Sequence, residues 1–202
     1  MLVLDPNAQD RLIRERRANG QDRWDEVWEG VYVLMPNPNV EHHDIATGLS
    51  TIFRVVVDWR GLGKVFQGIN VSDRVDDWTR NYRCPDVAVY LHGNPAVNCG
   101  THWRGGPDFA VEVVSPDDRA REKLGFYART GVRELLLIDR DPWALGLYRL
   151  RKTKLALAGK STPEHPEALT GAVVPLSFRL VPGDTRPRIE VAHADGLQRW
   201  LI

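Results

Sequence analysis

Residues 108–116 read DFAVEVVSP, and an acidic side chain, Glu112, stands in the middle of this run. The residues around it are apolar and favour β-structure: Phe109, Ala110, Val111, Val113 and Val114. Such a run is typical of a strand that is buried on both faces. A carboxylate there must be paired, protonated or bound to a metal, because an isolated charge is costly to bury. This stretch therefore indicates both the fold and the place to look for chemistry.

The letters that follow, SPDDRAREKLGFYARTG, predict a helix. Ser115 is its cap, Pro116 takes the first helical position, Asp118 completes a capping box, and Gly131 ends it. RELLLID, residues 133–139, then reads as another buried strand. A strand, a helix and a strand in this order predict a parallel pair joined by a right-handed crossover.

The part of the chain before this unit predicts a hairpin, a helix and two strands. RWDEVWEGVYVLMP alternates as a β-hairpin does, with Glu29-Gly30 at the turn. Asn39 caps the helix EHHDIATGLSTIFRVVVDWR, which we expect to end at Gly61. GKVFQGINVSDRV and CPDVAVYL read as strands on either side of a polar loop at residues 76–82. A short charged helix over residues 10–18 precedes all of these.

After residue 140, LGLYRLRKTKLALAG predicts a further hairpin, residues 160–170 a polar loop, and VPLSFRLVPGD an edge strand with a final turn. The order of elements predicts an α/β fold in which a mixed β-sheet is flanked by helices and preceded by an N-terminal β-hairpin. We expect one domain over residues 1–202, with its core roughly at residues 24–150.

Composition excludes several classes of protein. The chain has 202 residues, 27 basic and 27 acidic, so its formal net charge is zero, which argues against coating nucleic acid through bulk charge. Its two cysteines, Cys84 and Cys99, form neither a disulfide framework nor a CxxC metal motif. No apolar run approaches the roughly 20 residues of a membrane helix. We therefore expect a soluble, cytoplasmic protein without a membrane partner.

Five polar side chains lie where packing alone would favour apolar ones, and they are the candidate catalytic residues. Asp86 opens the strand VAVYL, Glu112 lies inside its strand, and Lys123 shares a helix face with Ala120 and Tyr127. In the first turn of the earlier helix, His42 lies near the apolar stripe and Glu41 somewhat further from it, whereas His43 points away. Either or both of Glu41 and His42 could face the sheet.

Two acids and a lysine that converge at one sheet edge suit metal-dependent hydrolysis of a phosphodiester. Asp86 and Glu112 are the candidate metal ligands, since carboxylate oxygens hold Mg²⁺, which polarises a phosphate and activates a bound water. Lys123 could orient that water or stabilise charge in the transition state. A bound cation would also neutralise the buried acid Glu112.

Four stretches occur in a characteristic order: WEGVYVLMP, CPDVAVY, DFAVEVVSP and REKLGFYARTGVRELLLID. This set resembles the Uma family (Uma-two) of restriction-endonuclease-like proteins, within the PD-(D/E)XK nuclease superfamily. The resemblance spans roughly residues 24–150, and VPLSFRL adds a weaker match. It implies a restriction-endonuclease-like core, Mg²⁺ or Mn²⁺ as cofactor, DNA as partner, and an endonuclease activity.

The resemblance also assigns roles to individual residues. Pro85-Asp86 matches the PD element, and Glu112 matches the acid of the (D/E)XK element, so both are implied metal ligands. The lysine expected two residues after that acid is Val114 here, and Lys123 on the following helix stands in for it. Glu41 resembles an acid that the superfamily often carries on its first helix, with His42 beside it.

Other interpretations stay open at this point. Glu112 could pair with a buried Arg or Lys, Lys123 could extend to water, and the first-turn acid Glu41 could serve only the helix dipole. A zinc site of His42, His43 and Asp86 is disfavoured because adjacent histidines diverge on a helix. The nuclease fold could also serve as a non-catalytic module that binds nucleic acid or protein. Two active sites related by a two-fold would suit cleavage of a duplex, so a homodimer is expected, with hairpin tryptophans at its interface.

Overall fold

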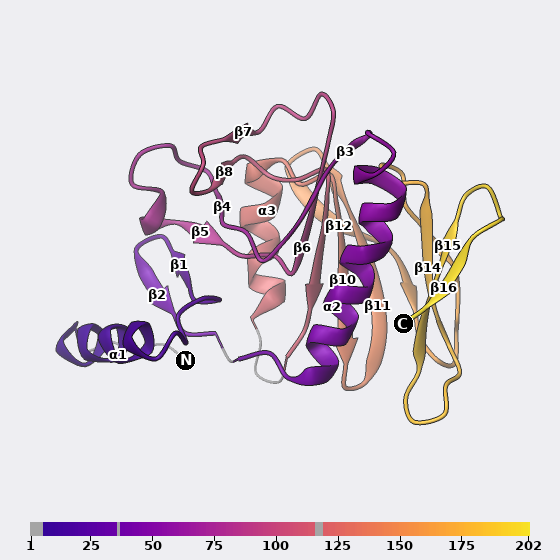
Figure 1. The fold of residues 1–202 in the computed structure, drawn as a ribbon, viewed down its shortest axis with the longest axis horizontal. Helices are drawn as coiled ribbons and strands as arrows, with labels where there is room; N and C mark the ends of the chain where they lie inside the picture. Colours follow the sequence, from indigo (N-terminus) through magenta and orange to yellow (C-terminus); the bar gives the residue numbers. More distant parts are fainter. Residues whose placement is uncertain (1–5, 36, 116–118) are drawn as a thin grey trace.

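The computed structural model describes residues 6–35, 37–115 and 119–202 (Figure 1). Its central sheet has six strands: β3 (Gly63–Gln67), β6 (Val87–Leu91), β9 (Phe109–Val113), β10 (Glu134–Arg140), β11 (Trp143–Arg151) and β12 (Lys154–Ser161). Their order across the sheet is β12-β11-β10-β9-β6-β3. β9 and β10 pair in parallel and all other neighbours pair antiparallel, so the sheet is mixed, as the sequence predicts.

The strand β9 is the centre of the fold. Every residue in it is buried, which confirms a strand covered on both faces. Because successive side chains point to opposite faces, Phe109, Val111 and Val113 join one core cluster and Ala110 joins the other. Glu112 alternates with Val111 and therefore points to the same face as Ala110.

A smaller sheet lies beside the central one. Its strands are β1 (Glu26–Trp28), β2 (Val31–Val33), β4 (Val71–Ser72), β5 (Tyr82–Arg83), β7 (Val97–Asn98) and β8 (Trp103–Arg104), in the order β2-β1-β5-β4-β8-β7. β1 and β2 form the expected hairpin, with positive φ at Glu29 (48°) and Gly30 (85°) in its turn. A 3-10 turn, Trp78–Arg80, precedes β5.

Three α-helices accompany the sheets: α1 (Pro6–Ala18), α2 (Val40–Phe53) and α3 (Leu124–Thr130). The Asn39 side chain caps α2 by accepting the His42 N–H at 2.9 Å, as expected. The last turn of this helix widens into a π-helical segment, Arg54–Asp58. Gly131 ends α3 in the left-handed conformation, with φ at 89°. None of the described helices is long and apolar enough to span a membrane.

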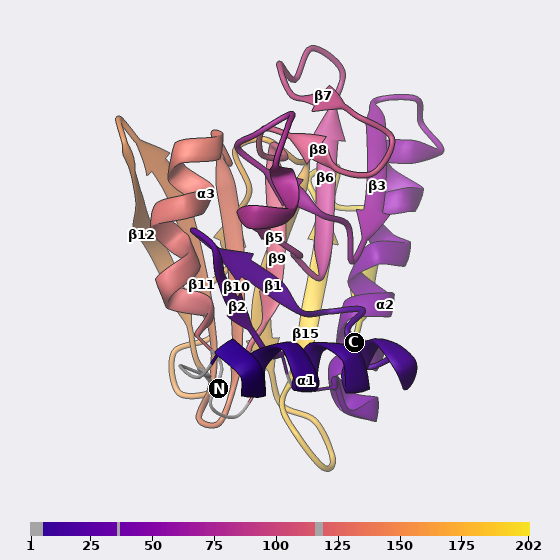
Figure 2. The ribbon, with the colours of Figure 1, turned by 90° about the vertical axis from the view of Figure 1, so that its left-hand side faces the viewer.

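The helices lie on opposite faces of the central sheet. α2 packs on one face together with a C-terminal sheet of four strands, and these elements share the larger core cluster. α3 covers the other face (Figure 2), where Phe126 and Tyr127 pack with Ala110 and Leu135. The carboxylate of Glu112 therefore points toward α3.

The structure corrects the expected helix start after β9. Pro116 and Asp118 lie outside the described residues, so the capping box is not described. A 3-10 turn, Ala120–Lys123, comes first, and α3 begins only at Leu124. The backbone at Arg119 has φ −103° and ψ 25°, outside the helical region, so a helix from Ser115 is not continuous.

The C-terminal region was also underestimated from the sequence. Its sheet contains β13 (Leu169–Thr170), β14 (Leu176–Val181), β15 (Arg188–His193) and β16 (Arg199–Leu201). β14 pairs with β13 on one side and β15 on the other, so it is not the predicted edge strand. Its apolar residues Leu176, Phe178 and Leu180 are buried at alternate positions in the larger core cluster.

Candidate active site

The Glu112 carboxylate is bound by two side chains from the segment that covers its face. Lys123 Nζ lies 3.0 Å from Glu112 Oε2 and 3.2 Å from Oε1. The Tyr127 hydroxyl donates a hydrogen bond to Oε1. Lys123 and Tyr127 are four residues apart, across the junction of the 3-10 turn with α3, and both are buried. The predicted face of Ala120, Lys123 and Tyr127 is thus confirmed, and it points at Glu112.

A second buried acid, Glu26 on β1, reaches the same lysine. Glu26 Oε1 lies 3.0 Å from Lys123 Nζ and accepts the backbone N–H of Cys84 at 2.8 Å. Its other oxygen accepts the indole N–H of Trp28 at 2.6 Å. Lys123 therefore sits between two carboxylates that come from sequence positions far apart.

Burial keeps two groups near this lysine protonated and neutral, the Tyr127 phenol and the Cys84 thiol. Burial, reinforced by the Glu112 charge, raises the pKa of Tyr127 well above its ordinary value, so the phenol stays protonated and donates. Burial likewise raises the pKa of the Cys84 thiol, and Glu26 adds to the effect. Cys84 is therefore a neutral thiol and not a nucleophile.

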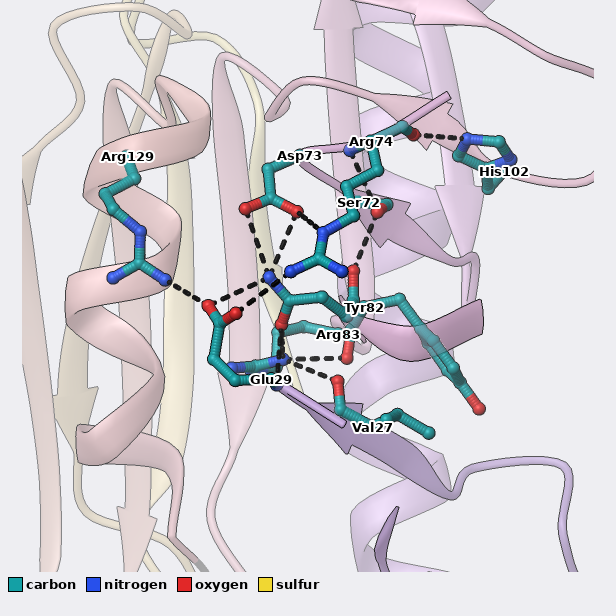
Figure 3. A network of polar contacts seen from close by, with 10 residues as sticks. Val27, Glu29, Ser72, Asp73, Arg74, Tyr82, Arg83, His102 and Arg129 are labelled. Carbon is teal, nitrogen blue, oxygen red and sulfur yellow. Dashed lines mark hydrogen bonds and ion pairs between the residues drawn. The ribbon is translucent and has the colours of Figure 1, made fainter. Parts of the chain in front are cut away.

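The hairpin that carries Glu26 is held in place at its turn (Figure 3). The Glu29 carboxylate accepts hydrogen bonds from Arg74 and Asn81, in the segment between β4 and β5, and from Arg129 on α3. The Asn81 amide also donates to both oxygens of Asp73 at 3.0 and 3.1 Å. These contacts fasten β1 to α3 on one side and to the loop after β4 on the other.

Asp86 is held at the start of β6 by two groups. Its Oδ2 accepts the Val113 N–H at 2.7 Å, which ties it to the strand of Glu112. Its Oδ1 lies 2.9 Å from His42 Nε2. Because a carboxylate can only accept, His42 Nε2 donates this hydrogen bond, and its Nδ1 lies 3.2 Å from the Ser115 hydroxyl. His42 is buried and His43 is exposed, as expected.

These residues line one small cavity. It has a volume of about 40 Å³, and its lining contains Asp86, Glu112, Lys123, His42 and Glu26. A water needs roughly 10–15 Å³ of such space, so the cavity can hold a few water-sized groups. Trp24 and Met35 from the hairpin and the loop after it also line it. Four of the five candidates from the sequence therefore meet at one place.

Glu41 does not join them. Its carboxylate is bound by two arginines, Arg140 at 3.0 Å and Arg186 at 3.3 Å. The Arg140 guanidinium also donates to Asn39 Oδ1 at 2.9 Å and to the Val114 carbonyl at 3.1 Å. Glu41 thus joins the start of α2 to the ends of β9 and β10, beside the site.

The zinc interpretation receives no support. Among the described residues, no group of three or more His, Cys, Asp or Glu side chains could hold a metal ion. A site based on His42 and His43 is disfavoured further because only His42 faces Asp86.

Glu26 and Ser115 were not identified as site residues from the sequence. The only sequence signal for Glu26 is an acid inside the short strand EVW, next to apolar neighbours. Ser115 reads as a helix cap, yet its hydroxyl contacts His42 and lies 3.4 Å from Arg140 Nη2. Neither partner is near Ser115 in sequence, so the pattern could not reveal the contact.

Comparison with known proteins assigns the sequence to a family. A family model named Uma2, described as "Putative restriction endonuclease", matches residues 11–180. The chain belongs to the Uma2 family. This confirms the resemblance inferred from the four sequence stretches. No curated protein matches the chain.

A solved structure supports the fold independently. The chain is similar to the crystal structure of a putative nuclease belonging to DUF820 from Anabaena variabilis ATCC 29413. The sequence identity is 20%, the TM-score is 0.56, and the match covers 73% of this chain and 80% of the other. At this identity the similarity establishes the fold. The Uma2 chain described here thus has a nuclease-like fold with its polar cavity at the end of β9.

Proposed function

We propose that this Uma2 protein is a metal-dependent endonuclease that hydrolyses phosphodiester bonds of DNA. The observation that carries the proposal is the convergence of Asp86, Glu112 and Lys123 on one cavity. The three residues come from a strand start, a strand interior and the turn before a helix. A buried cluster of ionisable groups at a cavity is typical of a catalytic site.

The donor atoms present fit Mg²⁺ or Mn²⁺. Both ions prefer oxygen ligands, and Mg²⁺ commonly binds through one or two carboxylates and keeps several waters. Asp86 and Glu112 supply carboxylates to the same cavity. Each carboxylate offers about four lone-pair positions, and the contacts of Asp86 to the His42 ring and to the Val113 N–H occupy two of them. When bound, the cation would polarise the phosphate and acidify a bound water.

The residues of the chain would orient the reacting groups. Lys123 holds a positive charge beside Glu112, where it can bind a phosphate oxygen or orient a water. Tyr127 fixes the Glu112 carboxylate through its hydrogen bond to Oε1. His42, with its proton on Nε2, keeps Asp86 in position through a second hydrogen bond. Glu26 forms an ion pair with Lys123 and so restricts the position of the ammonium group.

Lys123 can take the place of the lysine that the usual pattern carries two residues after the acid. That position is Val114 here, one residue past the end of β9. Lys123 instead approaches Glu112 from the segment packed on its face, at 3.0 Å. In this proposal Glu41 has a positioning role only. Its ion pairs hold the start of α2, the helix that carries His42.

The test is a cleavage assay on supercoiled plasmid and on single-stranded DNA, with Mg²⁺, Mn²⁺ or EDTA. We expect cutting with either metal, none with EDTA, and none by Asp86→Asn or Glu112→Gln. Cutting that persists in EDTA would contradict metal dependence. Cutting by Glu112→Gln at the wild-type rate would contradict the assigned site.

A non-catalytic module is the second candidate, and one observation favours it. Glu112 is already neutralised by Lys123 and hydrogen-bonded by Tyr127, so its burial needs no metal. Calorimetric titration with Mn²⁺ separates the two candidates. Heat of binding that disappears in Asp86→Asn supports the nuclease, and no heat at millimolar metal supports the module.

We also propose that the protein acts as a homodimer, because cutting both strands of a duplex is simplest with two sites related by a two-fold. Of the hairpin tryptophans expected at that interface, Trp28 already contacts other side chains of its own chain. The Trp28 ring is covered by the guanidinium groups of Arg83 and Arg119, at 4.6 and 4.9 Å. Light scattering that gives only the monomer mass at high concentration would contradict the dimer.

A further inference from the structure

A second cavity, of about 270 Å³, lies beside the candidate active site. Its lining includes Phe66 and Gly68 at the end of β3, Asn70, and the segment that leads into Trp103 on β8. The lining carries no Asp, Glu, Lys or Arg side chain. A site without charged groups is unsuited to a phosphate or a metal ion and suits a neutral ligand.

Two aromatic rings give this cavity a rigid apolar wall. The Trp103 ring stacks on buried Tyr90, with centroids 4.0 Å apart and an 18° angle between planes. Phe66 lies 5.8 Å from Trp103, tilted by 55°. Cavities of about 150 Å³ lined by apolar groups hold a benzene ring, so this larger one has room for a flat heterocycle.

Amide groups lie on its polar side. The Asn70 side chain forms no hydrogen bond with any described residue, although it lines the cavity and is half-buried. Asn98 accepts the Gly100 N–H at 2.8 Å through Oδ1, which leaves its NH₂ group to donate. An amide presents one donor and one acceptor side by side, the pair that matches the N6 and N7 edge of adenine.

The segment just before Trp103 is also ordered. His102 is buried and its Nε2 donates to the Arg74 carbonyl at 2.8 Å (Figure 3). The Thr101 hydroxyl lies 3.1 Å from its Nδ1. These contacts hold the segment from Thr101 to Trp103 against the loop after β4, so the cavity is preformed.

Gly68 joins this cavity to the candidate active site. Its N–H donates to the Asp86 carbonyl at 3.3 Å. On its other side it touches Trp24, where an added Cβ would lie 2.1 Å from the ring. Trp24 lines the active-site cavity and Gly68 lines the neutral one, so the two cavities meet at this pair of residues. A strand bound at Asp86 would pass directly by the neutral cavity.

We propose that the neutral cavity binds an unpaired nucleobase, with adenine preferred, of the strand whose phosphate lies at Asp86. The base stacks against the aromatic wall and its edge pairs with the Asn70 amide. This rests on the proposed nuclease function and defines its substrate as a strand with an accessible base, single-stranded or flipped out of a duplex.

The experiment measures binding and needs no cleavage. Fluorescence anisotropy in EDTA compares wild type and Asn70→Ala on labelled dA and dT homopolymers of about twelve nucleotides. Asn19→Ala, an exposed asparagine after α1, is the matched control. We expect wild type to prefer dA, and Asn70→Ala to weaken dA binding about five-fold or more with little effect on dT. The control should bind as wild type.

Equal affinity of wild type and Asn70→Ala for dA would overturn the proposal, as would an equal loss on dA and dT. A second readout keeps the test independent of that variant. Adenosine should shift the Trp103 indole N–H resonance, assigned with Trp103→Phe, whereas deoxyribose 5-phosphate should not. No shift with adenosine would also overturn the proposal.

The two proposals fail in different ways. If Asn70→Ala binds dA as wild type does while Glu112→Gln abolishes cutting, the nuclease function is supported and the base site is contradicted. If no metal supports cutting but dA binding depends on Asn70, the nuclease function falls and the base site stands.

Discussion

Lys123 Nζ lies 3.0 Å from Glu112 Oε2, and both side chains are only 4% exposed. The same nitrogen lies 3.0 Å from Glu26 Oε1, on a strand of the other sheet. The lysine thus pairs with two buried acids and joins the N-terminal hairpin to the central sheet. Its position makes it both a structural and a candidate catalytic residue.

Replacing this lysine should be costly to stability. Lys123→Met leaves two buried carboxylates without their cation, and we expect the free energy of unfolding to fall by about 3–5 kcal/mol. Lys64→Met removes an exposed pair with Asp58, of similar length at 2.9 Å, and should cost less than about 1 kcal/mol. Urea denaturation measures both. Similar losses in the two variants would contradict the assigned burial of the pair.

The hydroxyl of Tyr127 should contribute more to the free energy of unfolding than the hydroxyl of Tyr90, another buried tyrosine. Tyr127→Phe removes a donor to an ionised carboxylate, worth about 1.5–3 kcal/mol. Tyr90→Phe removes a donor to the Gly105 carbonyl at 3.2 Å, worth about 0.5–1.5 kcal/mol. Denaturation curves for both variants test this difference. A larger loss in Tyr90→Phe would show that Tyr127 does not support Glu112.

Alkaline pH should weaken the fold through Tyr82. Burial, reinforced by the Glu26 carboxylate, raises the pKa of Tyr82 from 10.0 to about 12. The folded state therefore holds this proton more tightly than the unfolded state, and the stability it contributes is present below pH 10 and lost as the pH rises to about 12. Tyr82→Phe should make unfolding less sensitive to pH over this range. An unchanged pH dependence in this variant would contradict the shift.

Metal should stabilise the protein through the two acids. A ligand at about 100 times its dissociation constant adds about 2.7 kcal/mol to the free energy of unfolding. We expect Mn²⁺ to raise the melting temperature of wild type, and not that of Asp86→Asn or Glu112→Gln. Because Lys123 neutralises Glu112 without metal, EDTA should leave the protein folded. An unchanged melting temperature of wild type with saturating metal would count against a carboxylate metal site.

Sequence reasoning identified the parts of the fold that depend on local pattern. The apolar run of β9, the turn at Glu29-Gly30 and the Asn39 cap are each encoded by neighbouring residues, and the structure confirms them. Of the C-terminal sheet, only one strand was expected, within VPLSFRLVPGD, although β14 and β15 each have six residues with alternating burial. Their burial depends on packing against α2 and the central sheet, which the local pattern does not contain.

The same distinction applies to the site. Asp86, Glu112 and Lys123 stand out because a charged residue interrupts an apolar pattern, and the structure brings them to one cavity. Glu26 meets Lys123 only because β1 pairs with β5 beside the central sheet, across many residues of chain. Of Glu41 and His42, of which either or both could face the sheet, His42 lies at Asp86, whereas Arg140 and Arg186 hold Glu41 beside the site.

The most direct test of the central claim compares two buried glutamates in the same sheet. Glu112 on β9 lines the cavity, whereas Glu134 on the neighbouring β10 pairs with Arg149 at 2.6 Å, away from it. The rate of plasmid cleavage with Mg²⁺ is measured for wild type, Glu112→Gln and Glu134→Gln, each shown to be folded. We predict that Glu112→Gln abolishes cutting and that Glu134→Gln retains it. Equal rates in the two variants would contradict the assignment of the nuclease centre to Glu112.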